Sequence, residues 1–177
     1  TVHTNLEPRR VNAIPQVADG GPFRTEITVA NLDSVPAVVT LRFFKSQGES
    51  GVTTPWDLAM EGNARIQSVV IPVGASYTVR TAGATAEVNQ GWGEVVSVNK
   101  IGGTAVFEFM QLDGRTQEAA VPISNTLMQR LLLPFDNTSG FVTSVAVINK
   151  HDSESARVTG VFRDPQGRIF KVAAFPT

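Results

Sequence analysis

The feature that most constrains the fold of this chain is a nine-residue pattern that occurs twice. Residues 23–31 have the sequence FRTEITVAN and residues 141–149 have the sequence FVTSVAVIN, so both fit F-x-T-x-[IV]-x-V-x-N at an offset of 118. Apolar residues fall at alternate positions of the pattern, and alternate side chains of a β-strand point to the same face. The pattern therefore predicts two equivalent strands, each with one face in a core.

The similarity continues past this pattern at an offset of 119. Residues 37–43 share four identical positions with residues 156–162, and Gln47-Gly48 returns as Gln166-Gly167. One extra residue in the loop 149–155 explains the change of offset. Similarity at a fixed spacing indicates a structural repeat. We interpret this one as a duplicated β-hairpin.

The two copies are unequal in length. After the first copy, alternation and turn residues predict five further strands, at 67–72, 76–81, 93–98, 104–112 and 117–123. After the second copy there is one predicted strand, at 168–175, so the second copy has the length of a half unit. Strand edges without a neighbour expose backbone groups that pair readily with other chains. The half unit is expected either to join the sheets of the first unit or to be completed by a neighbouring chain.

The composition favours an all-β fold throughout. Val, Thr, Ile and Phe together supply 59 of the 177 residues, and these residue types suit the pleated, half-buried surface of a sheet. Turn-forming residues interrupt the apolar runs at short intervals, which is typical of antiparallel sandwiches of the immunoglobulin-like class. We expect an N-terminal arm over residues 1–13, a first sandwich unit over residues 14–125 and a partial second repeat over residues 126–177.

One segment departs from the strand pattern. In residues 54–62, Thr54 can cap a helix, Pro55 suits the first helical position, and Gly62 provides a stop signal. The segment therefore predicts one short helix of one or two turns, inserted in a loop of the first unit.

Charge and cysteine content exclude several classes of function. Fifteen basic and sixteen acidic residues give a net charge of −1, so no overall field attracts nucleic acid or an anionic membrane. The sequence contains no run of apolar residues long enough to span a bilayer. The absence of cysteine excludes disulfides, thiolate catalysis and cysteine-ligated metals.

Residues suited to catalysis are sparse. The two histidines are His3, in the N-terminal tail, and His151, in a polar turn, and no G-x-S-x-G motif is present. Glu26, Glu94 and Glu108 fall on the polar faces of predicted strands, where solvation is the simplest interpretation. We therefore expect no catalytic residues, no cofactor and no enzymatic activity.

Aspartates in turns raise the question of calcium, which uses oxygen ligands from loops. None of these aspartates belongs to a D-x-[DN]-x-[DN]-G ligand ladder, and aspartate is common in turns because it bonds its own backbone. We expect no metal site from them. Two of the five, Asp19 and Asp136, each open the turn before a copy of the pattern; the others are Asp113, Asp152 and Asp164.

Three aromatic residues are candidates for ligand binding. Trp56, Tyr77 and Trp92 could stack on sugar rings, and Trp92 stands between Gly91 and Gly93, where its ring could be accessible. The alternative is that each ring anchors a loop on the core, because large aromatic side chains are usually mostly buried. We favour that alternative and keep polysaccharide as a possible partner.

Several segments carry a resemblance to known modules. The repeated pattern, the following A-x-V-T-x-x-F, the segment Gly91-Trp92-Gly93 and residues 102–107 resemble an uncharacterised β-sandwich repeat of secreted and surface proteins of environmental bacteria. More distantly they resemble immunoglobulin-like modules. The resemblance covers residues 14–125 in full and residues 133–176 in part. It implies an immunoglobulin-like fold and an extracellular or cell-surface location, and it supplies no catalytic residues.

These observations lead to two hypotheses of function. The first is a non-enzymatic extracellular structural protein, a subunit of a surface filament or adhesin that self-associates through strand pairing. In this hypothesis the arm over residues 1–13 could pair with another subunit. The second is a carbohydrate-binding accessory module that uses Trp92, Trp56 or Tyr77.

Overall fold

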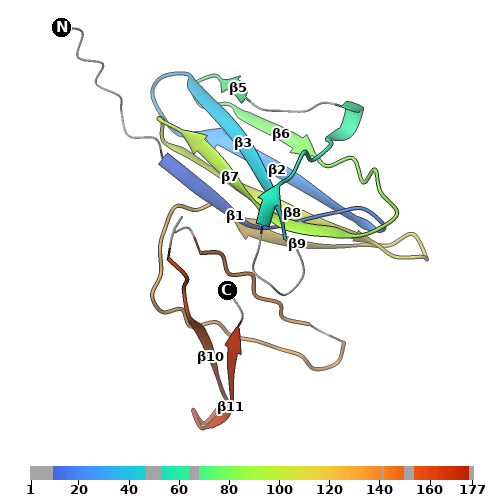
Figure 1. The fold of residues 1–177 in the computed structure, drawn as a ribbon, viewed down its shortest axis with the longest axis vertical. Coiled ribbons are helices and arrows are strands. Elements are labelled where there is room, and N and C mark those ends of the chain that lie inside the picture. Colours follow the sequence, from blue (N-terminus) through green and yellow to red (C-terminus); the bar gives the residue numbers. More distant parts are fainter. Residues whose placement is uncertain (1–9, 47–52, 64–67, 141, 150–153, 176–177) are drawn as a thin grey trace, which may run out of the picture.

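Two antiparallel sheets packed face to face make up most of the structure (Figure 1). The computed structural model describes residues 10–46, 53–63, 68–140, 142–149 and 154–175. The first sheet has the order β1 (Arg10–Asp19), β7 (Asn89–Ser97), β3 (Ala37–Ser46) and β4 (Thr53–Pro55), with β5 (Ser68–Ile71) also paired to β3. The second sheet has the order β6 (Ser76–Arg80), β2 (Phe23–Asn31), β8 (Ile101–Met110) and β9 (Thr116–Pro122). The predicted all-β sandwich is confirmed, and the five strands predicted after the first copy correspond to β5 to β9.

Both sheets contribute alternate side chains to one core, as the period of two requires. In β2 the buried positions alternate strictly, and β3 follows the same rule. The fully buried residues include Ile14 of β1, Ile27 of β2, Val39 of β3 and Val95 of β7. The polar residues of these strands therefore lie on the outer faces, apart from a few that are discussed below.

The first copy of the repeat is an arch between sheets, and the prediction of a hairpin is wrong. β2 belongs to the second sheet and β3 to the first, so the two strands do not pair with each other. The buried Asn31 side chain turns the chain from one layer to the other, because its amide donates to the carbonyl oxygens of Val35 and Ile71. Alternation fixes which face a residue occupies, but it does not fix which strands are neighbours.

The strand order also differs from the immunoglobulin order at the first strand. In immunoglobulin constant domains the first strand lies in the same sheet as the second. Here β1 pairs with β7 in the first sheet, and β8 pairs with β2 in the second. The strands β7 and β8, which follow each other in sequence, therefore lie in different sheets.

The start and end of the sandwich are joined by a short bridge. The N–H of Ala13 donates to the carbonyl of Ser124 at 2.7 Å, and the N–H of Ser124 donates back to Ala13. β1 begins at Arg10, so residues 10–13 of the predicted arm belong to the first sheet. Residues 1–9 of that arm lie outside the described residues.

The predicted helix over residues 54–62 is wrong. Thr53–Pro55 instead forms β4 at the edge of β3, and the N–H of Trp56 donates to the carbonyl of Phe43 at 2.8 Å. Met60 then bridges Thr81, which leaves only the 3-10 turn η2 (Glu61–Asn63). The open sheet edges compete successfully for the N–H groups that a helix would use. No helix among the described residues has the length and apolar character needed to cross a bilayer.

The second copy of the repeat forms fewer strands than predicted. β10 (Val158–Arg163) and β11 (Ile169–Phe175) make a separate two-stranded sheet, which confirms the strand predicted over residues 168–175. The strand predicted over residues 141–149 is wrong, because residues 142–149 adopt no regular secondary structure and Phe141 lies outside the described residues. Among the described residues no strand lies beside this segment to complete a ladder.

Candidate functional site

Trp92 lies on the outer face of the first sheet. Its ring stacks on Phe44, directly opposite on β3, with ring centroids 4.3 Å apart and an interplanar angle of 18°. Both side chains are partly buried. The next pair along the same face is Arg42 and Glu94, whose charged groups approach to 3.9 Å. The arrangement is a flat aromatic pair beside an ion pair between the exposed Arg42 and the partly buried Glu94.

Trp56 and Tyr77 occupy a different part of the molecule. Both are partly buried and pack against the core cluster, so the alternative of core anchoring fits their positions. Tyr77 is opposite Val29 in the β2–β6 ladder and shares the inner face with that buried residue. The structure therefore does not bring the three aromatic candidates together, and only Trp92 is on an outer sheet face.

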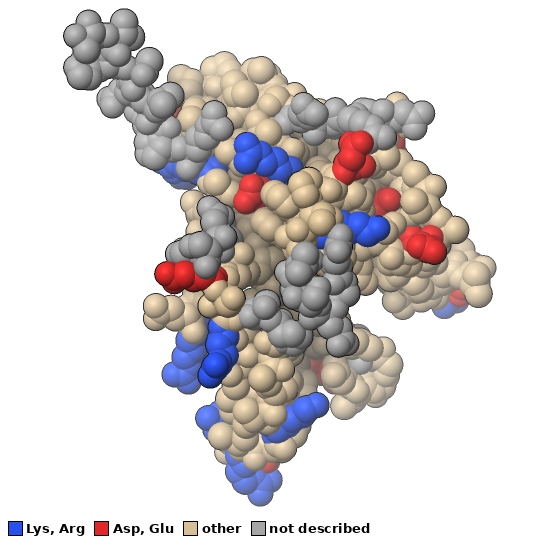
Figure 2. Space-filling model, viewed as in Figure 1, with Lys and Arg blue, Asp and Glu red and all other residues tan. Residues whose placement is uncertain are grey.

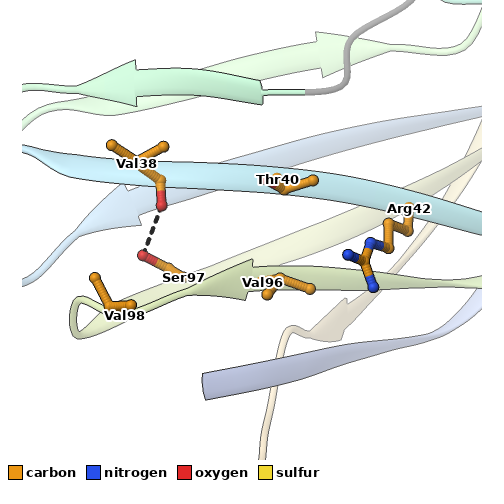
Figure 3. A pocket seen from close by; sticks show the side chains of 6 residues that line it. All are labelled: Val38, Thr40, Arg42, Val96, Ser97 and Val98. Carbon is orange, nitrogen blue, oxygen red and sulfur yellow. Dashed lines mark hydrogen bonds between the residues drawn. The ribbon is translucent and has the colours of Figure 1, made fainter. Parts of the chain in front are cut away.

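A shallow hollow of about 190 Å³ lies on the same outer face as Trp92 (Figure 3). Val96 of β7 lies opposite Thr40 of β3 in the ladder beneath it. The hydroxyl of Ser97 donates to the backbone carbonyl of Val38 at 2.8 Å. The six side chains around it include no histidine or carboxylate that could act as a base; they are Val38, Thr40, Arg42, Val96, Ser97 and Val98.

An ionic cluster occupies the outer face of the second sheet. Arg80 of β6 forms ion pairs with Glu108 of β8 and with Glu61, the latter at 3.2 Å. Partial burial works against the charged form of Arg80, but the hydrogen bond and charge of Glu108 outweigh it and raise the pKa of the guanidinium. The cluster ties β6, β8 and η2 together and leaves no carboxyl group in an apolar setting.

The carboxylates with shifted pKa values are held in the ionised form. N–H groups of Lys100 and Ser34 and the side chain of Asn99 donate to Asp33 and lower its pKa. Hydrogen bonds from Thr138 lower the pKa of Asp136. This direction is opposite to that of a general acid, which needs a raised pKa at neutral pH.

Three of the five aspartates considered for calcium bond their own turns. Asp113 accepts the N–H of Arg115, and Asp136 accepts the N–H of Thr138. Asp164 accepts the N–H groups of Gln166 and Arg168, and these bonds lower its pKa against the effect of burial. Asp19 is buried and accepts the N–H of Gly83 at 2.7 Å. Within the described ranges no three acidic or histidine side chains gather into a possible metal site.

Three titratable candidates lie outside the described residues. These are His3, His151 and Asp152. Phe44, the stacking partner of Trp92, was not predicted from the sequence, and neither was Arg80 with its two carboxylates. Both sets depend on cross-strand register between distant segments, and no local signal in the sequence gives that register.

Exposed large apolar side chains are most numerous in the C-terminal region, residues 127–175. Most of the large apolar side chains that are exposed among the described residues belong to it, including Leu132 at 89% and Val142 at 80% exposure. In the β10–β11 hairpin, Val161, Phe170 and Val172 are also exposed. Apolar patches of this kind mark interaction surfaces in soluble proteins. The C-terminal region is therefore the strongest candidate for a functional surface.

Comparisons of this chain with models of protein families, with curated proteins and with solved structures find no match.

Proposed function

We propose that this chain is a non-enzymatic structural protein that associates with other chains through β-strand pairing. The observation that carries the proposal is the exposed apolar surface of the C-terminal region, which has the residue pattern of strands. In line with the resemblance to secreted bacterial modules, we place its role in an extracellular or cell-surface filament or adhesin.

The β10–β11 hairpin supports this proposal because it is short of neighbours. A two-stranded hairpin is marginally stable in water and normally needs further strands or a packed face. Ile169, Phe170 and Val172 of β11 are each more than half exposed, on both faces of the hairpin. Strand addition by a neighbouring chain would cover these side chains and pair the free backbone groups.

The charge distribution favours contact between unlike parts of two molecules. Residues 126–177 contain six basic and four acidic residues, whereas residues 1–125 contain nine basic and twelve acidic residues. Figure 2 shows basic side chains gathered over the β10–β11 end and side chains of both signs over the sandwich. Because opposite potentials attract and like potentials repel, the C-terminal region is suited to the sandwich of another copy. Such a head-to-tail contact builds an open chain of subunits.

β9 offers an edge for such a contact. At one end of the β8–β9 ladder, the N–H of Ile123 donates to the carbonyl of Gly103. At the other end, the N–H of Gln111 donates to the carbonyl of Arg115. Antiparallel bonds alternate along a strand, so the N–H groups of Glu118 and Ala120 point away from β8. No described strand lies beyond them.

The test is the mass of the purified 177-residue chain in solution, measured by sedimentation as a function of concentration. The account expects species heavier than the 19.0 kDa monomer. Phe170→Asp should shift the chain toward monomer, because a charge cannot be buried in a strand interface without cost. Val70→Asp is the matched control, since Val70 has 63% exposure against 60% for Phe170 but lies on the first sheet. A compact monomer at every concentration would reject the proposal.

Carbohydrate binding is a second candidate, favoured by the aromatic pair of Trp92 and Phe44. The pair lies on an outer sheet face, where a sugar ring could stack against an aromatic edge or face. Trp92→Ala should abolish retention on a polysaccharide panel, whereas Tyr77→Phe, which changes a ring packed on the core, should leave it intact. Equal retention of both variants would remove this candidate.

A further inference from the structure

Thr25 has a structural role that alternation alone does not explain. It is a fully buried polar residue on the core face of β2. Its hydroxyl donates to the carbonyl of Ala18 at 2.8 Å and accepts the N–H of Ala18 at 3.0 Å. This reciprocal pair of bonds ties the end of β1 to β2 across the corner between the sheets.

Thr143, the equivalent residue of the second copy, makes the same pair of bonds at the same spacing. Its hydroxyl donates to the carbonyl of Asp136 and accepts the N–H of Asp136, both at 3.0 Å. In each copy the partner is seven residues earlier in the chain. The sequence pattern suggests Asp19 as the counterpart of Asp136, but the bonds show that Asp136 occupies the position of Ala18.

The asparagine that ends each pattern also repeats its contact. Asn31 donates to the carbonyl of Val35, four residues later, and Asn149 donates to the carbonyl of Glu154, five residues later. The separation is one residue longer in the second copy because of the extra residue in the loop 149–155, which also changes the repeat offset from 118 to 119. The insertion is thus absorbed in the loop while the asparagine contact is retained.

The backbone before each pattern provides a third correspondence. Gly21 has a φ of 53°, and Ser139, which is 118 residues later, has a φ of 52°. Among the described residues Ser139 is the only non-glycine residue with positive φ. A residue with a side chain adopts this conformation only where its surroundings impose it. The correspondence is limited to this one residue, because the neighbouring positive φ belongs to Gly20 in the first copy and to Gly140 in the second, which are not equivalent positions.

One bond differs between the copies, and it indicates what the second copy lacks. The N–H of Thr25 donates to the hydroxyl of Thr81, just past the end of β6, and the N–H of Thr81 donates to the carbonyl of Thr25. The N–H of Thr143 instead donates to the side chain of Asn137, within its own turn. A local side chain therefore holds the backbone group that a neighbouring strand holds in the first copy.

We infer that residues 142–149 are a preorganised counterpart of β2 and form a binding site for β-strands of the β6 and β8 type. β8 is paired on both sides within the sandwich, whereas β6 is an edge strand of the second sheet. We therefore assign the supply to the β6 edge of a second copy of this chain. This inference rests on the proposed function and specifies which segment pairs and with what kind of strand.

The registers of β2 define the partner. Ile27 lies between Val79 of β6 and Ala105 of β8, and Val29 lies between Tyr77 and Gly103. At an offset of 118 these two residues correspond to Val145 and Val147, which are exposed at 57% and 59%. A partner strand of the β6 type therefore has large apolar residues at alternate positions, and a partner strand of the β8 type has small residues at alternate positions.

The experiment adds a polypeptide with the sequence of residues 68–122 to the intact 177-residue chain. This probe carries β6 and β8 without β2, so it has a vacant position for the second-copy strand. Hydrogen exchange of the amides in residues 142–148 is then measured with and without the probe. The inference expects at least tenfold slower exchange, whereas the amides of β2 should stay protected throughout and report that the sandwich is folded.

Two variants at adjacent positions sharpen the test. Val145→Asp should abolish the protection, because it places a charge where Ile27 is buried in the first copy. Ser144→Glu should retain it, because Glu26 occupies that outward position in β2.

The outcomes separate this inference from the proposed function. If the chain self-associates but the probe leaves exchange in residues 142–148 unchanged, the inference is wrong and the proposed function stands. If the probe protects these residues in a chain that is monomeric by itself, the inference is supported and self-association is rejected. Protection that survives Val145→Asp would overturn the inference, since contact would then not use the core face of the strand.

Discussion

At the scale of single residues, the polar members of the repeated pattern carry more structural information than the apolar ones. Any alternation of valine and isoleucine predicts a strand, but a buried threonine and a buried asparagine need partners at fixed positions. Thr25 and Asn31 find theirs in Ala18 and Val35, and the second copy repeats both contacts. In the sequence these Thr and Asn residues are visible only as identities between the copies, because nothing local identifies the backbone groups that they bond.

The hydrogen bonds of Thr25 should contribute measurably to the free energy of unfolding. Thr25→Val keeps the shape of the side chain but leaves the N–H and carbonyl of Ala18 without that partner, so the free energy of unfolding should fall by about 1–3 kcal/mol. Thr28→Val is the matched control, because Thr28 is on the outer face of the same strand and bonds the exposed Thr78 hydroxyl. Urea unfolding of both variants checks this, and equal losses would contradict it.

Asp33 should give the loop after β2 a dependence on pH. Hydrogen bonds from Lys100 and Ser34 lower its pKa below the ordinary value of 3.8 in the folded state. A lowered folded-state pKa means that the stabilisation is present above the unfolded pKa and is lost as pH falls through the folded value. The difference in urea midpoint between the native chain and Asp33→Asn should therefore be larger at pH 7 than at pH 2. A difference independent of pH would show that the carboxylate charge contributes nothing.

At the scale of elements, the sequence predicted where strands lie and failed on which strands pair. β5, β6, β8 and β9 fall within two or three residues of their predicted bounds, because a period of two over five or more residues is a local signal. The arch between β2 and β3 and the neighbour relations of β1 depend on long-range pairing, which alternation does not encode. The helix expected over residues 54–62 failed for the same reason, since distant sheet edges bind that segment.

Because β3 and β7 approach closely at Gly91, we expect a substitution there to lower the stability of the fold strongly. A Cβ at this position would overlap the backbone carbonyl of Phe44, which cannot move without separating the two strands. Gly91→Ala should therefore lower the free energy of unfolding by roughly 1–3 kcal/mol or more. At Gly102 the nearest atoms belong to the flexible Leu32 side chain, so Gly102→Ala should cost much less. Thermal unfolding of the two variants compares them directly.

The edge of β9 predicts a specific effect on assembly. Ala120→Pro removes one N–H that points away from β8, and proline is tolerated at such edge positions because no bond to β8 is lost. The variant should keep the fold but reduce self-association, whereas Ala120→Val, which retains the N–H, should associate as the native chain does. Sedimentation of the two variants at equal concentration makes the comparison. Equal association would show that the β9 edge is not an acceptor.

At the scale of the whole molecule, the chain combines a sandwich with a two-stranded sheet, β10 and β11, which pairs with no other strand in the part of the chain that the structure describes. The bridge between Ala13 and Ser124 joins the start and the end of the sandwich, and the domain boundary near residue 125 stays a prediction. The prediction of unequal copies came from the sequence alone, because the repeat is visible as identities at a fixed offset. The consequence for structure was not predictable, because whether residues 142–149 form a strand depends on a partner that the pattern does not contain.

The central claim is that residues 142–148 become a strand when chains associate. Hydrogen exchange of these amides, followed in the 177-residue chain from dilute to concentrated solution alongside its sedimentation mass, tests it most directly. The account predicts that protection of residues 142–148 rises together with mass, while the amides of β2 stay protected at every concentration. A mass that grows while residues 142–148 exchange as fast as in the monomer would contradict it.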